Sequence, residues 1–508
     1  MMPVDLITFQ PYLLKSPEEN AGPMSEKTDF YRKLNIETGA SEEAIKRAYR
    51  LAVRKAHPDV NKNEGATQLF LDIQEAYKIL SDPGQKGAYD EGREPQYTPP
   101  AVYTTVEYSQ NALTRGEEPQ IIYSLIDIVS TQVEKEPSDL PLNISLVLDN
   151  STSMDGTRLD ILKATTKEII QELNEDDLIS VISFNDRAKV LLPSQIKPQV
   201  SHVESNIGGL FAEGGTEIFQ GLETAFEEIR KNSSFDFVNH IILITDGHTY
   251  GDEDNCINLA KSAAELGIGI SGYGIGIEWN DEFIDELCGL TGGQSLFIQD
   301  INKVKDFLEN SIASLKEAYS KQVALEITTA PGVKMLSAFR ILPEALPLPQ
   351  QEQFSLGILK KDQPHRILFE FMVNPIPKEI ERAVIASGEF ILKRKPRDFT
   401  IPFTLDRVII SESEEPTSPP EEIFRAISHL TFYRLQEKAQ NDLANGNPGT
   451  AFQRLINLSS HLMAKGEESL AKIAMHEADY IKSHSNFSPT GKKELKYGTI
   501  RLMLPNKT

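Results

Sequence analysis

The central part of the chain alternates hydrophobic runs with amphipathic stretches. The runs comprise Ile144–Leu148, Leu178–Phe184, His240–Thr245 and Ile268–Ile275. The stretches between them, with apolar residues at helical spacing, include Leu159–Leu173, Ile218–Ile229 and Asn255–Leu266. A strand that is covered by helices on both faces is hydrophobic along its whole length. The pattern therefore predicts a Rossmann-like, doubly wound α/β domain with a parallel sheet over residues 141–319.

The segments on either side have different patterns, which makes the chain a multidomain protein of mixed α+β and α/β class. Strand-like alternation occupies residues 102–140 and 320–410, and we hypothesise that both segments build one β-sandwich around the inserted α/β domain. Helical spacing over residues 421–485 predicts a small antiparallel helical bundle. We expect a disordered extension over residues 1–27, linkers at 92–101 and 411–420, and a tail at 486–508.

The charge balance excludes several classes of partner. The chain has 52 Lys and Arg residues against 75 Asp and Glu residues, a formal net charge of −23. Nucleic acid and anionic membranes would repel such a chain, so we expect neither as a partner. The two cysteines, Cys256 and Cys288, provide no disulfide framework. No apolar run approaches the roughly 20 residues of a membrane span, and we predict a cytoplasmic protein.

A helical segment over residues 28–91 carries the first chemical signal. Ser41 is suited to cap a helix that begins at Glu42 and ends where Pro58 disfavours the α conformation of His57. The tripeptide His57, Pro58 and Asp59 therefore starts a loop between two amphipathic helices. The first of these helices presents a basic face that consists of Lys46, Arg47, Arg50 and Arg54.

This arrangement resembles the J domain of DnaJ-family co-chaperones, which also place the tripeptide between two helices. The resemblance implies docking on a DnaK-class heat-shock chaperone, with the basic face against an acidic patch of the chaperone. Asp59 would then pair with a chaperone arginine and promote ATP hydrolysis. The resemblance thus assigns chaperone binding to His57, Pro58, Asp59, Lys46, Arg47, Arg50 and Arg54.

The second signal is a set of oxygen-bearing side chains at the ends of predicted strands. Asp149, Ser151 and Ser153 follow the first hydrophobic run, and Asp246 follows the third. Thr216 comes after two glycines that allow a loop to approach closely. Because the carboxyl ends of parallel strands meet at one edge of a sheet, we expect these groups to converge there. Oxygen ligands without His or Cys favour a hard cation such as Mg²⁺.

These three segments resemble the metal-ion-dependent adhesion site of the von Willebrand factor type A domain. The resemblance implies that Ser151 and Ser153 coordinate the metal directly, and Thr216 directly or through water. It implies that Asp149 and Asp246 act mainly through water, and that an acidic side chain of a protein ligand completes the shell. The metal would be Mg²⁺ or another divalent cation such as Mn²⁺ or Ca²⁺.

Together, the two signals predict a non-enzymatic adaptor that stimulates a DnaK-class chaperone and binds a protein partner through the metal. The alternative is a metal-dependent scaffold or a regulatory subunit of an ATPase complex, in which chaperone recruitment is incidental. We find no P-loop, no G-x-S-x-G and no Ser/His/Asp spacing. A metal-dependent hydrolase would need a general base beside the cluster, and the sequence offers none.

Overall fold

The computed structural model divides the chain into two compact units, residues 1–101 and 102–508, which we describe separately. The described residues are 30–34, 36, 40–41, 44–46, 48–49, 52, 73, 76–90, 102–130, 140–196, 198, 200–232, 237–249, 251–361, 363–377, 380–393, 398–410 and 419–503. The segments 1–27 and 92–101 and most of 411–420, predicted above as an extension and linkers, lie outside these residues.

The first unit contains a small helical core. Its described helices are α1 (Phe30–Lys33) and α4 (Pro83–Asp90). The Tyr31 hydroxyl donates to Asp90 Oδ1 at 2.9 Å, which joins the two ends of this segment. The rings of Tyr49 and Tyr77 stack with centroids 3.9 Å apart. Tyr49 and Tyr77 lie on the two predicted amphipathic helices, so these helices meet through their apolar faces.

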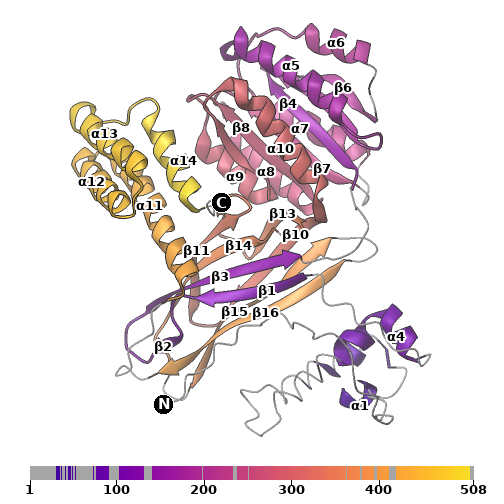
Figure 1. Ribbon diagram of the computed structural model, residues 1–508, viewed down its shortest axis with the longest axis vertical. Helices are drawn as coiled ribbons and strands as arrows, with labels where there is room; N and C mark the ends of the chain where they lie inside the picture. Colours follow the sequence, from indigo (N-terminus) through magenta and orange to yellow (C-terminus); the bar gives the residue numbers. More distant parts are fainter. Residues whose placement is uncertain are drawn as a thin grey trace, which may run out of the picture. The chain divides into compact units, whose positions relative to one another are not determined.

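Six strands form the central sheet of the second unit, in the order β6-β5-β4-β7-β8-β9 (Figure 1). Their bounds are β4 Leu142–Asp149, β5 Leu178–Phe184, β6 Ala188–Ile196, β7 Val238–Thr245, β8 Ile268–Ile275 and β9 Ser295–Ile298. All neighbours pair in parallel except β6, which pairs antiparallel with β5. Only residues 185–187 separate these two strands, too few for a crossover connection. The predicted parallel sheet is thus confirmed, with one added antiparallel edge strand.

Helices cover both faces of this sheet, as predicted. One layer consists of α5 (Thr157–Glu172), α6 (Val200–Gly208) and α10 (Val304–Lys316). The other consists of α7 (Ile218–Lys231), α8 (Glu253–Glu265) and α9 (Asp281–Thr291). Within β4, Leu146 packs under the first layer and Val147 under the second, because successive strand residues point to opposite faces. Both are fully buried, which explains the unbroken hydrophobic run.

Two five-stranded sheets lie beside the α/β domain, in the orders β1-β3-β14-β11-β12 and β13-β10-β15-β16-β2. The bounds are β1 Val102–Tyr108, β2 Ala112–Thr114, β3 Gln120–Ser130, β10 Ala318–Thr329, β11 Val333–Leu342, β12 Leu346–Leu348, β13 Gln353–Lys360, β14 His365–Val373, β15 Arg382–Lys393 and β16 Phe399–Ile410. Because β3 pairs with β14 and β2 with β16, segments before and after the α/β domain share both sheets. Phe354 and Phe369 contact each other between the sheets, with ring centroids 6.0 Å apart.

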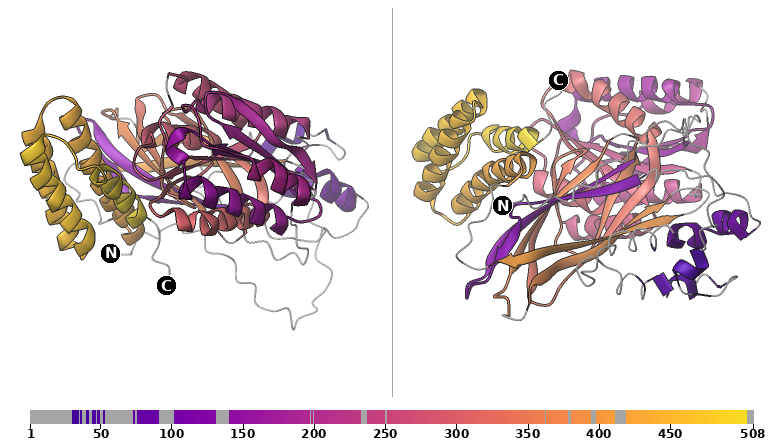
Figure 2. Two further views of the ribbon diagram at one scale, coloured as in Figure 1. Left: turned by 90° about the horizontal axis from the view of Figure 1, so that it is seen from above. Right: turned by 60° about the horizontal axis from the view of Figure 1, so that its bottom comes forward.

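Four helices end the described chain: α11 (Glu421–Ala444), α12 (Pro448–Ala464), α13 (Glu468–His484) and α14 (Gly491–Met503). Both views of Figure 2 show them grouped beside the sheets. The bundle is confirmed, but the prediction of a tail over residues 486–508 is wrong for residues 491–503. This segment has four basic residues and no continuous apolar stripe, so its pattern does not indicate a helix. Its helix is stabilised by contacts with other elements instead.

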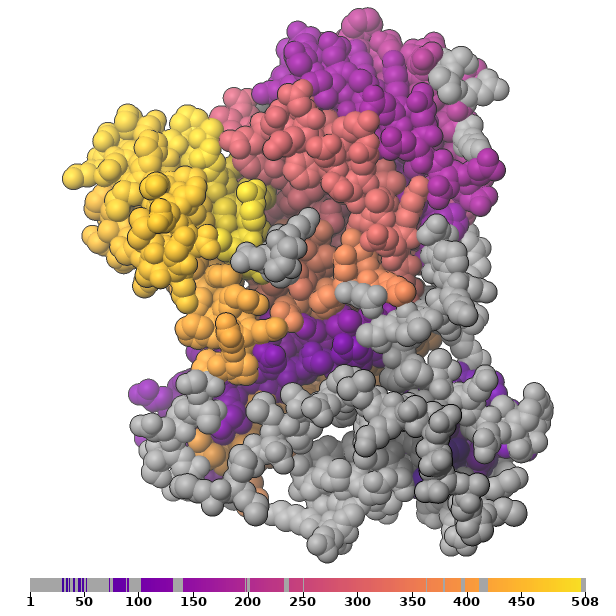
Figure 3. Space-filling view, in the orientation of Figure 1, coloured from indigo at the N-terminus to yellow at the C-terminus, as the bar shows by residue number. Residues whose placement is uncertain are grey.

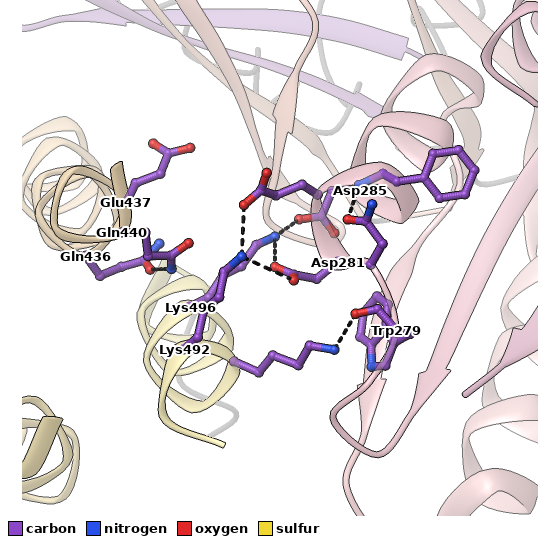
Figure 4. A network of polar contacts seen from close by, with 12 residues as sticks. Trp279, Asp281, Asp285, Gln436, Glu437, Gln440, Lys492 and Lys496 are labelled. Atoms are coloured by element: carbon purple, nitrogen blue, oxygen red, sulfur yellow. Dashed lines mark hydrogen bonds and ion pairs between the residues drawn. The ribbon is translucent and has the colours of Figure 1, made fainter. Parts of the chain in front are cut away.

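Basic side chains of α14 contact the start of α9 in the α/β domain (Figure 4). Lys496 Nζ lies 2.5 Å from Asp281 Oδ2 and 2.6 Å from Asp285 Oδ2, and all three side chains are 5% exposed. Lys493 Nζ donates to the Trp279 carbonyl oxygen at 2.6 Å and lies 4.2 Å from a centroid of the indole ring. In the space-filling view, the yellow helices lie directly against the α/β domain (Figure 3). These buried ion pairs join the helical bundle to the α/β domain.

Candidate metal site at the carboxyl edge of the sheet

The candidate site lies where two neighbouring parallel strands end. β4 ends at Asp149, and β7 ends at Thr245, directly before Asp246. The Thr245 hydroxyl donates to Asp149 Oδ2 at 2.6 Å, which joins the two strand ends. The Asp149 carboxylate is fully buried, and Asp246 is 1% exposed. The pairing of β4 with β7 therefore brings together two acids that are 97 residues apart in the sequence.

Hydroxyl groups connect these two acids into one hydrogen-bonded chain. Ser151 begins a sharp turn into a short 3₁₀ helix, η1 (Thr152–Met154), and its backbone N–H donates to Asp149 Oδ1 at 2.7 Å. The hydroxyls of Ser151 and Ser153 lie 3.0 Å apart, and the Ser153 hydroxyl donates to Asp246 Oδ1 at 2.6 Å. Four of the five predicted ligands thus share one network.

The fifth predicted ligand, Thr216, reaches the same edge on a loop before α7. The Gly214 carbonyl accepts from the Thr152 hydroxyl at 2.9 Å, which attaches this loop to η1. Gly214 has a φ of 73°, a conformation that favours glycine. The Thr216 hydroxyl lies against Gly247, where an added methyl carbon would be 3.0 Å from Thr216 Oγ1. The structure therefore places all five predicted side chains at one edge of the sheet.

Burial and charge shape the electrostatics of the site. Burial raises the pKa of Asp149 to about 6, although hydrogen bonds from Ser151 and Thr245 oppose that shift. Arg158, in the first turn of α5, forms an ion pair with Asp246. Sequence reasoning missed this arginine, since one basic residue at a helix start is no signal of a site. It also left Thr245 without a role, although this hydroxyl directly precedes Asp246 at the strand end.

The donor set fits a hard divalent cation. All five side chains offer oxygen, as two carboxylates and three hydroxyls, and Mg²⁺ prefers oxygen ligands while it retains several waters. Within the described residues, no group of three or more His, Cys, Asp and Glu side chains is arranged to hold a metal. A hydroxyl-rich site falls outside that pattern, because its acids number only two. Ser153 is exposed, so the site is open to an incoming ligand.

The structure describes only one of the predicted chaperone-binding residues. Lys46 is exposed, and the backbone N–H of Ala44 donates to the predicted cap, Ser41 Oγ, at 3.3 Å. The others lie outside the described residues: Arg47, Arg50, Arg54, His57, Pro58 and Asp59.

In the part of the chain that the structure describes, no helix is both long and apolar enough to cross a bilayer.

Comparisons with known proteins match three separate parts of the chain. Residues 29–90 match the DnaJ domain family, and residues 143–310 match the von Willebrand factor type A domain family. Residues 421–505 match the Sll0103-like, C-terminal alpha-helical domain. The chain contains a DnaJ domain and a von Willebrand factor type A domain.

Relatives of the chain agree with these matches. The uncharacterized protein sll0103 of Synechocystis is 27% identical over 336 residues, which cover 63% of this chain and 78% of that protein. The chaperone protein DnaJ of Enterococcus faecalis is 45% identical over 78 residues, 15% of this chain and 20% of that chaperone. The chain thus shares with DnaJ only a fifth of the chaperone's length, so the activity of the whole chaperone does not transfer from this match.

A solved structure resembles most of the chain. The von Willebrand factor type A protein from Catenulispora acidiphila has a TM-score of 0.64 and 16% identity, and it covers 80% of this chain and 98% of that chain. At this identity the likeness shows the fold alone. The DnaJ and von Willebrand factor type A domains together indicate a DnaJ-like co-chaperone with a protein-binding domain.

Proposed function

We propose that this protein is an adaptor between a DnaK-class chaperone and a second protein. Its DnaJ domain recruits the chaperone and stimulates its ATPase, and its von Willebrand factor type A domain binds a protein partner through Mg²⁺ or another divalent cation. The observation that carries the proposal is the hydrogen-bonded chain from Asp149 through Ser151 and Ser153 to Asp246, in a chain that also has a DnaJ domain.

In this proposal, each site residue has one role toward the cation. Ser151 and Ser153 hold it directly, Thr216 directly or through water, and Asp149 and Asp246 through water. The bound cation supplies an electrophilic centre that an acidic side chain of the partner completes. The net charge of −23 would repel an acidic partner from other parts of the surface. The bound cation therefore permits the association at this site. Ser153 is exposed, which supports access of a partner to the site.

The chaperone interaction rests on the DnaJ match and on the tripeptide His57, Pro58 and Asp59. The match to the DnaJ domain family spans residues 29–90, which include this tripeptide. In the described part of the domain, Tyr31 bonds to Asp90 and the rings of Tyr49 and Tyr77 stack, which supports a folded domain. A local basic face can approach an acidic partner even on a net-anionic protein.

Metal binding is tested by thermal unfolding with and without Mg²⁺. Because a ligand that binds only the folded state stabilises it, saturating Mg²⁺ should raise the melting temperature of the wild-type chain. Asp149→Ala should remove that increase. Asp155→Ala is the matched control, since Asp155 is an exposed acid on the same loop, and it should keep the increase. An equal Mg²⁺ effect in Asp149→Ala and the wild type would refute the metal site.

Chaperone stimulation is tested by the ATPase rate of a DnaK-class chaperone mixed with the full chain. Asp59→Asn should abolish stimulation, because the side chain that pairs with the chaperone arginine loses its charge. Asp149→Ala should stimulate like the wild type, since the metal site takes no part in this step. If Asp59→Asn stimulates normally, the chaperone half of the proposal is wrong.

A further inference from the structure

The last helix, α14, lies at the same edge of the central sheet as the candidate metal site. β8 and β9 run parallel to β4 and β7, so the carboxyl ends of all four strands share one edge. The segments that follow β8 and β9 both contact α14. Lys493 Nζ lies 4.2 Å from a centroid of the Trp279 ring, and Gln299 Nε2 donates to Glu494 Oε1 at 3.5 Å. The metal site and α14 therefore border neighbouring strand ends.

Arg158 lies between these two places and contacts both sides. Its guanidinium forms an ion pair with Asp246, one of the predicted metal ligands. It also lies beside the first residue after β8, since a methyl carbon added to Gly276 would be 3.4 Å from Arg158 Nη2. The Gly276 carbonyl accepts from Trp279 Nε1 at 3.0 Å, and the Trp279 carbonyl accepts from Lys493 Nζ at 2.6 Å. A continuous series of contacts thus joins Asp246 to α14.

A divalent cation at the site would compete with Arg158 for Asp246. Both are positively charged, and Asp246 is 1% exposed, so water screens their mutual repulsion little. The edge as a whole stays acidic, because three further acids lie on neighbouring loops: Asp155, Asp186 and Glu213. The competition therefore concerns Asp246 itself. Arg158 is free to leave it, since its side chain is 44% exposed, but it then loses its position beside Gly276.

We infer that Arg158 couples occupation of the metal site to docking of α14, and that each disfavours the other. With Asp246 engaged by a cation, Arg158 moves away, and the loop of Gly276 and Trp279 packs less well beneath α14. With α14 released, this loop is free to move, and Arg158 leaves Asp246 more easily. Coupling between two equilibria is reciprocal, so both effects have the same size. The inference rests on the proposed metal site and makes the helical bundle a regulator of that site.

The first test measures the Mg²⁺ affinity of the full chain by isothermal titration calorimetry. Lys496→Met weakens docking of α14 because it breaks the buried ion pairs, and it should tighten Mg²⁺ binding roughly fivefold or more. Lys493→Met should act in the same direction, and it leaves no carboxylate unpaired because Lys493 bonds to a carbonyl. Lys492→Met is the matched control. It removes the same charge from a side chain of α14 that is 38% exposed, so it measures the effect of charge alone.

The second test asks whether Arg158 carries the coupling, and it uses a double-mutant cycle. Arg158→Gln should itself tighten Mg²⁺ binding, because the competitor for Asp246 is gone. In the Arg158→Gln background, Lys496→Met should change the Mg²⁺ affinity no more than Lys492→Met does. If Lys496→Met has the same effect with and without Arg158, this side chain does not connect the two sites, and the inference is overturned.

The fluorescence of Trp279 supplies a further readout that needs no partner protein. Trp279 is 1% exposed with α14 docked, so saturating Mg²⁺ should shift the wild-type emission to longer wavelength. Arg158→Gln should bind Mg²⁺ without this shift. If neither the wild type nor any variant binds Mg²⁺, the proposed metal site is refuted, and the coupling with it. If Mg²⁺ binds with unchanged emission and with equal affinity in the wild type and Lys496→Met, the metal site stands and the coupling alone is refuted.

Discussion

The substitution Lys496→Met tests whether buried ion pairs attach α14 to the α/β domain. The side chain of Lys496 is 5% exposed, and its ammonium group lies within 2.6 Å of both Asp281 and Asp285. Burial alone would lower the pKa of Lys496, but attraction to Asp285 and Asp281 raises it well above its ordinary value. Methionine preserves the apolar stem and removes the charge, which leaves the buried Asp285 carboxylate without its ion pair and Asp281 with only the longer, 3.9 Å contact to Lys492. Breaking a buried pair in this way costs about 3–5 kcal/mol, or roughly a hundred- to several-thousand-fold in the docking equilibrium.

The fluorescence of Trp279 can report the release of α14, because Trp279 is the only tryptophan in the chain. It is 1% exposed, and its ring contacts Lys493 and Tyr497 of α14. Release of α14 exposes the indole to water, so its fluorescence should shift to longer wavelength. In a urea titration followed by this emission, Lys496→Met should lower the urea concentration at the midpoint of the transition. The size of the decrease should equal the energetic cost of the substitution divided by the m-value of the transition.

Lys492→Met is the matched control on the same helix. Lys492 is 38% exposed and pairs with the exposed Glu282 at 3.0 Å, an interaction worth about 0–1 kcal/mol. It also lies 3.9 Å from Asp281 Oδ1, a longer contact than the 2.5 Å between Lys496 and Asp281. If the two variants shift the transition equally, the buried pairs do not hold the helix. A triple variant that adds Asp281→Asn and Asp285→Asn should recover part of the loss, since no buried charge then remains unpaired.

Two further predictions concern the stability of the second unit. Burial, aided by Arg340 and Lys360, lowers the pKa of His365 from 6.5 to about 3. As the pH falls, His365 is therefore protonated in the unfolded chain before it is protonated in the folded chain. The free energy of unfolding should then decrease as the pH drops from about 6.5 toward 3. His365→Gln should flatten this decline in urea midpoints measured between pH 7 and 4, and an unchanged slope would contradict the shift. Gly274→Ala should lower the melting temperature, because its methyl carbon would lie 1.9 Å from the Trp279 ring, and overpacking costs about 1–3 kcal/mol. Gly449→Ala, with no atom within 4 Å of the added carbon, should not, and equal melting temperatures for both would refute the steric reasoning.

Sequence patterns were most informative where local chemistry and tertiary environment agree. Strands buried on both faces are hydrophobic throughout, so the run Leu178–Phe184 predicted β5 with the bounds that the structure has. The positions of Asp149 and Asp246 directly after such runs predicted that they would meet at one sheet edge, and they share a hydrogen-bonded network. The sequence could predict this cluster because the carboxyl ends of the strands meet at one edge in every parallel sheet.

Sequence patterns did not predict the contacts of side chains whose partners lie on distant elements. From the sequence, Lys496 would be expected on the surface, because lysine is almost never fully buried without a partner. Its partners are about 210 residues away in the sequence, so the pattern around Lys496 does not reveal them. Trp279 gave no sign that it lies beneath the last helix. Arg158 contacts Asp246 only because α5 begins beside the end of β7.

The sequence by itself determined the parallel sheet, the helical bundle and the group of oxygen-bearing side chains at one sheet edge. Buried faces repeat at the period of the helix or strand, and the residues at a strand end are adjacent in the sequence, so both features are visible in the chain. The tertiary structure alone decided which distant charges meet: the ion pairs of α14 with α9 and the contact of Arg158 with Asp246. The physical reason is that hydrophobic periodicity records how each element faces the core, whereas pairing of charges across elements depends on their relative placement in space.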